Sequence, residues 1–214
     1  MSVVALPARL QDHTEPLKWV ALAAMTFDHI NTFLLAGSVP ALYALGRIAF
    51  PLFALVLASN LARPSAHYGR LSARLVGFGL LAALPLTVMG HAMPLNVMFT
   101  FAAAVLVIAL RDAGWLKSGA VAFVLLGIVV DYHWPGLLLI VAARRYFATK
   151  GTGSMLVTLG ALVALAWPNE NYWALAAVPV ILAVQHAQID VPRLRWAFYA
   201  YYPLHFAVLA LLAK

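Results

Sequence analysis

The most constraining feature of this sequence is a succession of long apolar runs separated by short polar connections. The run 94–110 contains no charged residue, and the run 72–90 contains one. A helix that spans a membrane needs about 20 predominantly apolar residues. Over all 214 residues, 64% are hydrophobic and 10% are charged, whereas a soluble domain has about 45–50% and 25%. The sequence therefore predicts an all-α, polytopic transmembrane helical bundle and excludes a soluble domain.

The apolar runs divide the chain into nine predicted spans within a single domain, residues 1–214. The predicted spans are 17–36, 40–61, 72–90, 94–110, 116–132, 134–148, 152–168, 172–186 and 196–213. The fifth, sixth and eighth are short for a bilayer core, and a re-entrant hairpin of the fifth and sixth is the alternative. We find no linker, low-complexity tract or internal repeat.

Basic residues are unevenly distributed among the connections. The N-terminal tail carries Arg9, and every second connection is basic. These connections hold Arg63 and Arg70, then Arg111 and Lys117, then Arg144, Arg145 and Lys150, then Arg193 and Arg195. The others, 37–39, 91–94, 133–135 and 168–172, contain no Lys or Arg. Because cytoplasmic loops are enriched in Lys and Arg, we predict a cytoplasmic N-terminus and an outer C-terminus. The same rule accounts for the net charge of +7, so the expected partner is the lipid bilayer and not nucleic acid.

Ionisable residues inside the predicted spans concentrate in the first hairpin. With Ser38 as its tip, Asp28 and His29 lie nine or ten residues before the tip and Arg47 lies nine after it. At 1.5 Å per residue, all three share a depth of about 13 Å. Ionisable groups within a membrane are costly and usually functional, so we predict a triad of Asp28, His29 and Arg47. The alternative is a structural ion pair of Asp28 and Arg47.

Lys18 and His29 share one face of the first predicted helix. Eleven residues at about 100° each end about 20° from three full turns, and the imidazole lies about 16 Å deeper than the ammonium. Such a face would hold a long anionic ligand, with its phosphates at Lys18 and its reactive end at His29. The alternative is that Lys18 snorkels to the membrane edge.

Two further sets of polar residues lie near the other spans. In the last span, Tyr202 and His205 are three residues apart and share a face. Asp131 and His133 form a weak resemblance to a metal pair, but no third ligand at suitable spacing accompanies them. We therefore predict no metal site.

Three segments in the first, second and last spans carry a family resemblance. They are residues 18–30 (KWVALAAMTFDHI), 46–54 (GRIAFPLFA) and 201–205 (YYPLH). In this order they resemble the TraX family. The resemblance implies a membrane-embedded acetyltransferase of the bacterial inner membrane that acetylates the N-terminus of conjugative pilin, with acetyl-CoA as donor.

A fainter similarity to the acyltransferase 3 superfamily covers the first two spans. That superfamily has a basic residue, ten intervening positions and a His in its first helix, and Lys18 and His29 keep the spacing. Lys replaces the usual Arg, and it presents a point charge where Arg presents a fork. Residues 47–51 (RIAFP) are similar to the superfamily's Arg-x-x-x-Pro segment.

Together, these features suggest roles in acetyl transfer. His29 is the expected general base, because imidazole titrates near physiological pH. Asp28 is adjacent in sequence and points about 100° away, so we expect it to orient Arg47, which would fix the thioester or the acceptor. His205 with Tyr202 is the candidate second proton carrier or oxyanion donor.

The phosphates of CoA are expected on the cytoplasmic side. Their candidate ligands are Lys18, Arg63, Arg70 and Arg74, of which the last three share one face if that segment is helical. Two other functions stay open, a small ion-coupled transporter that uses the charged triad as a relay and a non-enzymatic pilus or membrane assembly factor. The lack of a detectable repeat weighs mildly against a transporter.

Overall fold

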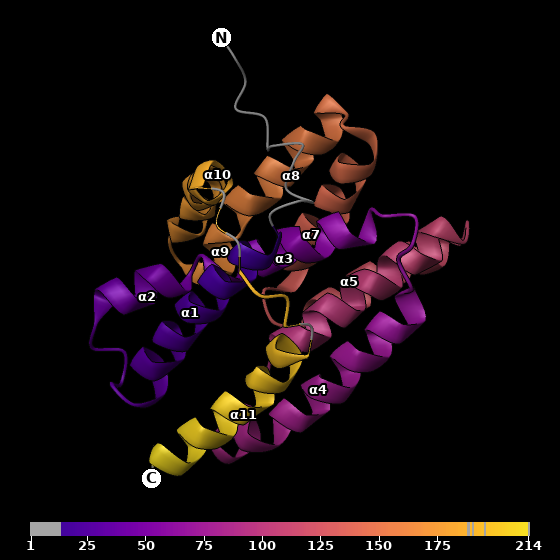
Figure 1. Ribbon diagram of the computed structural model, residues 1–214. Helices are drawn as coiled ribbons and strands as arrows, with labels where there is room; N and C mark the ends of the chain where they lie inside the picture. The colour runs from indigo at the N-terminus through magenta and orange to yellow at the C-terminus, as the bar shows by residue number, and fades with distance from the viewer. Residues whose placement is uncertain (1–13, 188, 190, 195, 214) are drawn as a thin grey trace.

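The computed structural model of this chain describes residues 14–187, 189, 191–194 and 196–213, which form a helical bundle (Figure 1). Its elements are α1 (Thr14–Phe33), α2 (Pro40–Gly46), α3 (Ala49–Leu61), α4 (Tyr68–Val88), α5 (Val97–Asp112), α6 (Leu116–Val129), α7 (His133–Thr149), α8 (Thr152–Ala164), α9 (Ala166–Asn169), the 3₁₀ helix η1 (Trp173–Ala176), α10 (Ala177–Ala187) and α11 (Ala197–Leu212). The described residues contain no strand, so the predicted all-α fold is confirmed. Arg9 and Arg195, which belong to the predicted charge pattern, lie outside the described residues.

Each predicted span coincides with one helix or with two that meet at a break. The second span breaks at Arg47 and Ile48, between α2 and α3. Pro51 then falls in the first turn of α3, where its missing N–H leaves no hydrogen bond unmade. Gly46 is the last residue of α2. It has no Cβ, and a Cβ at this position would overlap the side chain of Asp28. The break therefore brings the second span into close contact with α1.

Three of the described helical stretches are long and apolar enough to cross a membrane. These are Pro40–Leu61 with 22 residues, Tyr68–Val88 with 21 and Thr152–Asn169 with 18. The outward faces of shorter helices are apolar as well, since Val121 and Leu125 on α6 are 57% and 59% exposed. Such surfaces are rare on soluble monomers and suit a lipid environment. The number of spans and their orientation stay predictions.

Connections that were assigned to one side of the membrane meet at one end of the bundle. Tyr68 donates a hydrogen bond to Asp112 (2.6 Å), and Arg144 donates to Tyr68 (3.2 Å) and forms an ion pair with Asp112. The connections before α4, after α5 and after α7 therefore adjoin one another at what we call the basic end. At the opposite end, Leu95 and Val130 form an isolated β-bridge between two connections that lack Lys and Arg.

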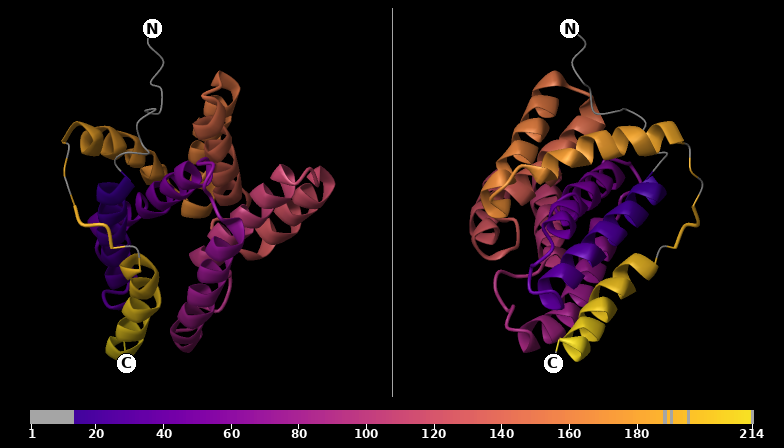
Figure 2. Two further views of the ribbon diagram at one scale, coloured as in Figure 1. Left: turned by 45° about the vertical axis from the view of Figure 1, so that its right-hand side comes forward. Right: turned by 90° about the vertical axis from the view of Figure 1, so that its left-hand side faces the viewer.

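The helices that position the site are α1, α4 and α11. Helix α11 packs along α4 and contacts α1, as the two views of Figure 2 show. Helices α3, α5 and α7 pack against one another in the middle of the bundle, where Leu52, Leu137 and Ile140 are fully buried. The candidate site therefore lies between this core and the pair formed by α1 and α11.

Candidate active site

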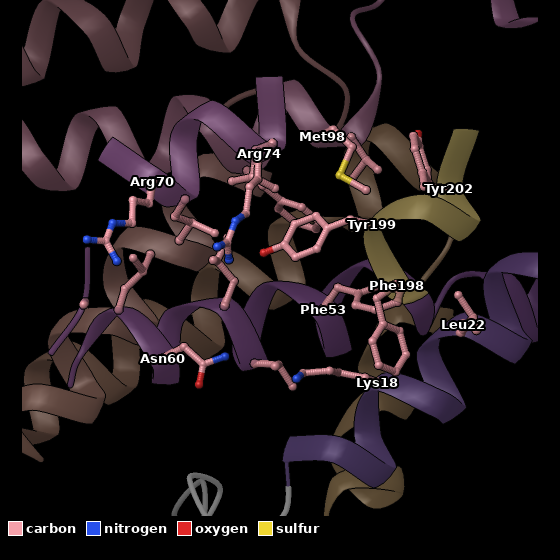
Figure 3. A pocket seen from close by; sticks show the side chains of 18 of the residues that line it. Lys18, Leu22, Phe53, Asn60, Arg70, Arg74, Met98, Phe198, Tyr199 and Tyr202 are labelled. Carbon is pink, nitrogen blue, oxygen red and sulfur yellow. The ribbon is translucent and has the colours of Figure 1, made fainter. Parts of the chain in front are cut away.

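A pocket of about 410 Å³ lies between α1, α3, α4, α5 and α11 (Figure 3). It includes residues 65–67 of the connection before α4, so it reaches the basic end. We call it the cationic pocket, because its lining includes Lys18, Arg70, Arg74 and Arg193. Figure 3 shows Arg70 and Arg74 on α4 across the pocket from Lys18 on α1.

Three of the four predicted phosphate ligands line this pocket, and the fourth does not. Arg70 and Arg74 are one turn apart on α4, and Lys18 faces them from α1. Helix α3 ends at Leu61 and α4 begins at Tyr68, so Arg63 lies in the turn between them. The shared face that was expected if this segment is helical therefore includes Arg70 and Arg74 but not Arg63.

Glu15 is the counter-ion beside the cationic pocket. Its Oε1 lies 2.6 Å from Lys18 Nζ and 3.6 Å from Arg193 Nε. Its Oε2 is buried and has no hydrogen-bond partner among the described residues. Four cations and this single carboxylate leave the pocket with an excess of positive charge, which favours an anionic ligand.

Two residues of the pocket lining adjoin the predicted catalytic histidines. Met25 precedes His29 by one turn of α1, and the ring centroid of Tyr202 lies 5.6 Å from that of His205 on α11. One turn of an α-helix rises about 5.4 Å. The inner part of the pocket therefore comes within about one helical turn of His29.

His29 and His205 form a hydrogen-bonded pair between α1 and α11. His29 Nδ1 lies 2.7 Å from His205 Nε2, and the two rings are inclined by only 8°. Phe206 packs against both rings, with centroids 4.6 Å and 4.2 Å away. Phe33 lies beside His29 and also contacts His91, which belongs to a connection at the opposite end. The pair thus lies between the cationic pocket and that end.

The hydrogen bonds of the pair assign its tautomers when both rings are neutral. His205 Nδ1 lies 3.0 Å from the carbonyl oxygen of Tyr201, which can only accept, so this nitrogen carries the hydrogen. His205 Nε2 is then an acceptor, and His29 Nδ1 must donate to it. This leaves His29 Nε2 with a lone pair that no described residue engages in a hydrogen bond, which is the form that a general base requires.

Of the predicted triad of Asp28, His29 and Arg47, the structure shows the Asp28–Arg47 pair, as expected for an Asp28 that orients Arg47. His29 does not join this pair, because it points to His205. Adjacent residues of a helix project about 100° apart, so Asp28 and His29 face different neighbours. Arg47 also donates to Asn169 Oδ1 (3.4 Å). Arg47 therefore belongs to a separate buried cluster and does not line the cationic pocket.

The residues considered as a metal pair serve local structure. Asp131 Oδ1 accepts a hydrogen bond from the N–H of Tyr132 (2.9 Å). His133 Nδ1 lies 3.2 Å from the carbonyl oxygen of Gly127. Over the part of the chain that the structure describes, no group of three or more His, Cys, Asp or Glu side chains is placed to hold a metal ion.

Sequence reasoning missed the residues that hold the histidine pair in place. The ring of Tyr201 stacks on that of His205 at 5.2 Å, and its hydroxyl lies 2.8 Å from Thr26 Oγ1. Thr26 donates to the carbonyl of Leu22, so Tyr201 is the donor to Thr26. The signal was helical spacing, because Thr26 precedes His29 by three residues and Tyr201 precedes His205 by four. Glu15 and Arg193 were also missed as parts of the site.

Comparison with known proteins confirms the family resemblance. A profile described as TraX protein matches residues 13–213. Protein TraX of Escherichia coli is 29% identical over 214 aligned residues, which cover 92% of this chain and 86% of the relative. Protein TraX of Escherichia coli strain K12 is 31% identical over 156 residues, which cover 70% of this chain and 62% of the relative. No solved structure matches. Since the profile match extends over nearly the whole chain, this protein belongs to the TraX family.

Proposed function

We propose that this protein is an acetyltransferase of the bacterial inner membrane that moves an acetyl group from acetyl-CoA to an amine. The observation that carries the proposal is the position of the cationic pocket, which approaches a histidine pair with one free imidazole nitrogen. The acceptor that we propose is the N-terminus of conjugative pilin, because three segments of the chain resemble TraX proteins.

The cationic pocket suits both ends of acetyl-CoA, the phosphate groups and the acyl-bearing arm. Phosphate groups would meet Lys18, Arg70, Arg74 and Arg193 at the basic end, where guanidinium groups form charge-assisted hydrogen bonds with phosphate oxygens. The acyl-bearing arm would extend between apolar side chains such as Phe53 and toward Met25 and Tyr202. The basic end is the predicted cytoplasmic side, where acetyl-CoA is available.

The chemistry needs a proton acceptor and a donor for the oxyanion. As the amine nitrogen bonds to the thioester carbonyl carbon, His29 Nε2 takes the proton that the amine loses. The C–S bond then breaks, and that proton passes to the CoA sulfur, so an amide and the free thiol are the products. The hydroxyl of Tyr202 is the candidate oxyanion donor. Arg47 has no direct role in this scheme and acts by fixing α1 against α2.

The proposal is tested with purified full-length protein, acetyl-CoA and a peptide that carries the pilin N-terminus, with the acetylated product measured by mass spectrometry. His29→Asn should lower the rate by about 10²–10⁴-fold, the usual contribution of a general base, and should keep the melting temperature and CoA affinity. His186→Asn is the matched control, because His186 is exposed and its side chain bonds, among the described residues, to the carbonyl of Leu182 within α10. A folded His29→Asn protein with near-normal turnover would overturn the proposed mechanism.

The role of His205 is tested by comparing two substitutions. His205→Gln keeps a side-chain oxygen that can accept from His29 Nδ1, whereas His205→Leu removes the acceptor. Because His205 acts through His29, we expect His205→Leu to lower the rate and change the pH–rate profile, and His205→Gln to restore part of both. Equal losses in the two variants with an unchanged pH profile would contradict this positioning role.

A further inference from the structure

A second cavity of about 220 Å³ lies at the basic end, outside the cationic pocket. We call it the arginine cavity, because Arg111 of α5 and Arg144 and Arg145 of α7 line it. Asp112 is the one carboxylate in its lining, and its partners are Arg144 and Tyr68. Arg144 is therefore neutralised, and the charges of Arg111 and Arg145 are left in excess.

The guanidinium groups of this cavity have unused hydrogen-bonding capacity. The side chains of Arg111 and Arg145 have no hydrogen bond or ion pair with any residue that the structure describes. Arg144 Nε is buried and has no partner within the same residues. The stem of Arg111 packs over Gly119, since a Cβ on that glycine would lie 3.2 Å from Arg111 Cγ. Arg111 is half-buried and Arg145 is exposed, so their donors are accessible to an anion at this small cavity.

The surroundings of the arginine cavity indicate the source of the anion. Leu116 lines the cavity and is 64% exposed, and beside it Trp115 is also 64% exposed. Below them, the exposed apolar face of α6 runs away from the basic end. Trp is enriched where a membrane meets water, so the cavity lies at the level of lipid headgroups with an apolar surface beneath it.

We propose that the arginine cavity binds the phosphate group of an anionic phospholipid, whose acyl chains lie along α6. Guanidinium groups recognise phosphate through paired, charge-assisted hydrogen bonds, and basic pockets on the cytoplasmic side of membrane proteins bind anionic headgroups. The positive-inside rule requires only cations in these connections. It does not require three arginines around one cavity, and Asp112 neutralises only one of the three.

The test measures lipid retention by native mass spectrometry and the shift of melting temperature on adding lipid. The probes are phosphatidylglycerol, phosphatidylcholine and inorganic phosphate, added to the purified full-length protein. We expect phosphatidylglycerol alone to be retained and to raise the melting temperature. The double substitution of Arg111→Gln and Arg145→Gln should weaken this binding about tenfold or more. Arg144 is kept, because it holds α4, α5 and α7 together.

A matched control removes the same charge from the same end. Lys117→Gln with Lys150→Gln also deletes two cations there, but neither residue lines the arginine cavity, so retention of phosphatidylglycerol should persist. An equal loss in both double variants would overturn the proposal, because it would show diffuse attraction to the membrane. Inorganic phosphate that stabilises the protein as well as phosphatidylglycerol would overturn the lipid as the source of the anion.

Discussion

Replacing Glu15 with Gln should strengthen CoA binding. The Glu15 carboxylate lies 2.6 Å from Lys18 Nζ and 3.6 Å from Arg193 Nε, and both cations line the cationic pocket. A phosphate in contact with Lys18 would lie about 6 Å from that carboxylate. Two like charges at this distance repel each other by about 0.7 kcal/mol in water, and by about 2.8 kcal/mol at an effective dielectric constant of 20. The Glu15→Gln substitution removes this repulsion and frees both cations.

The expected gain in affinity lies between these limits. The side chains of Lys18 and Glu15 are 20% and 16% exposed, so solvent screens the repulsion only in part. An intermediate value of about 1.4 kcal/mol corresponds to about tenfold tighter binding. The assay is isothermal titration calorimetry with CoA at low and high salt, and the difference between variant and parent should shrink at high salt.

Glu170→Gln is the control for this measurement. It is the same substitution with the same change in net charge, and Glu170 is exposed in the connection after α9 and does not line the cationic pocket. Its CoA affinity should match that of the parent. Unchanged or weaker binding in Glu15→Gln, with the fold intact, would refute the assignment of Lys18 and Arg193 as phosphate ligands.

Three other predictions concern the fold and its orientation. Gly46→Ala should lower the free energy of unfolding by about 1–3 kcal/mol, because the added Cβ would overlap Asp28. Gly77→Ala should raise it by about 0.5–1 kcal/mol, because a Cβ at this position would have nothing within 4 Å. Denaturation curves that shift the same way for both variants would contradict this packing. Arg47→Met should cost about 3–5 kcal/mol by leaving the buried carboxylate unpaired, and adding Asp28→Leu should restore both folding and acetylation. A folded but inactive double variant would instead give Arg47 a direct role. A reporter inserted near Ala66 should be cytoplasmic and one in the 91–94 connection should be on the other side; finding both on one side would exclude the predicted topology.

Local periodicity was enough to predict the parts of the site that lie on one helix. Lys18 and His29 share a face because α1 is continuous from Thr14 to Phe33. Arg70 and Arg74 likewise reach one pocket because they are one turn apart on α4. In each case a single helix fixes the relation between two side chains, and no tertiary information is needed.

Contacts between distant segments could not be predicted in the same way. His29 and His205 are 176 residues apart in sequence, and the depth argument grouped His29 with Arg47 on the neighbouring span instead. The rotation of α1 decides which helix His29 faces, and the close contact of Gly46 with Asp28 is one of several tertiary contacts that fix this rotation. The error at Arg63 has a different origin, because the helix start at Tyr68 depends on the turn before it and not on the spacing of basic residues.

The three-way contact of Tyr68, Asp112 and Arg144 connects the walls of both cavities. Tyr68 begins α4, the helix that brings Arg70 into the cationic pocket, while Arg144 lines the arginine cavity. An anion that accepts a hydrogen bond from the unpaired Nε of Arg144 would share this guanidinium group with Asp112 and would so alter the contact that holds the first turn of α4. Thermodynamic linkage makes such an effect reciprocal, since each ligand alters the affinity for the other by the same factor. If both proposed ligands bind, the lipid composition of the membrane would change the affinity of the cationic pocket for CoA.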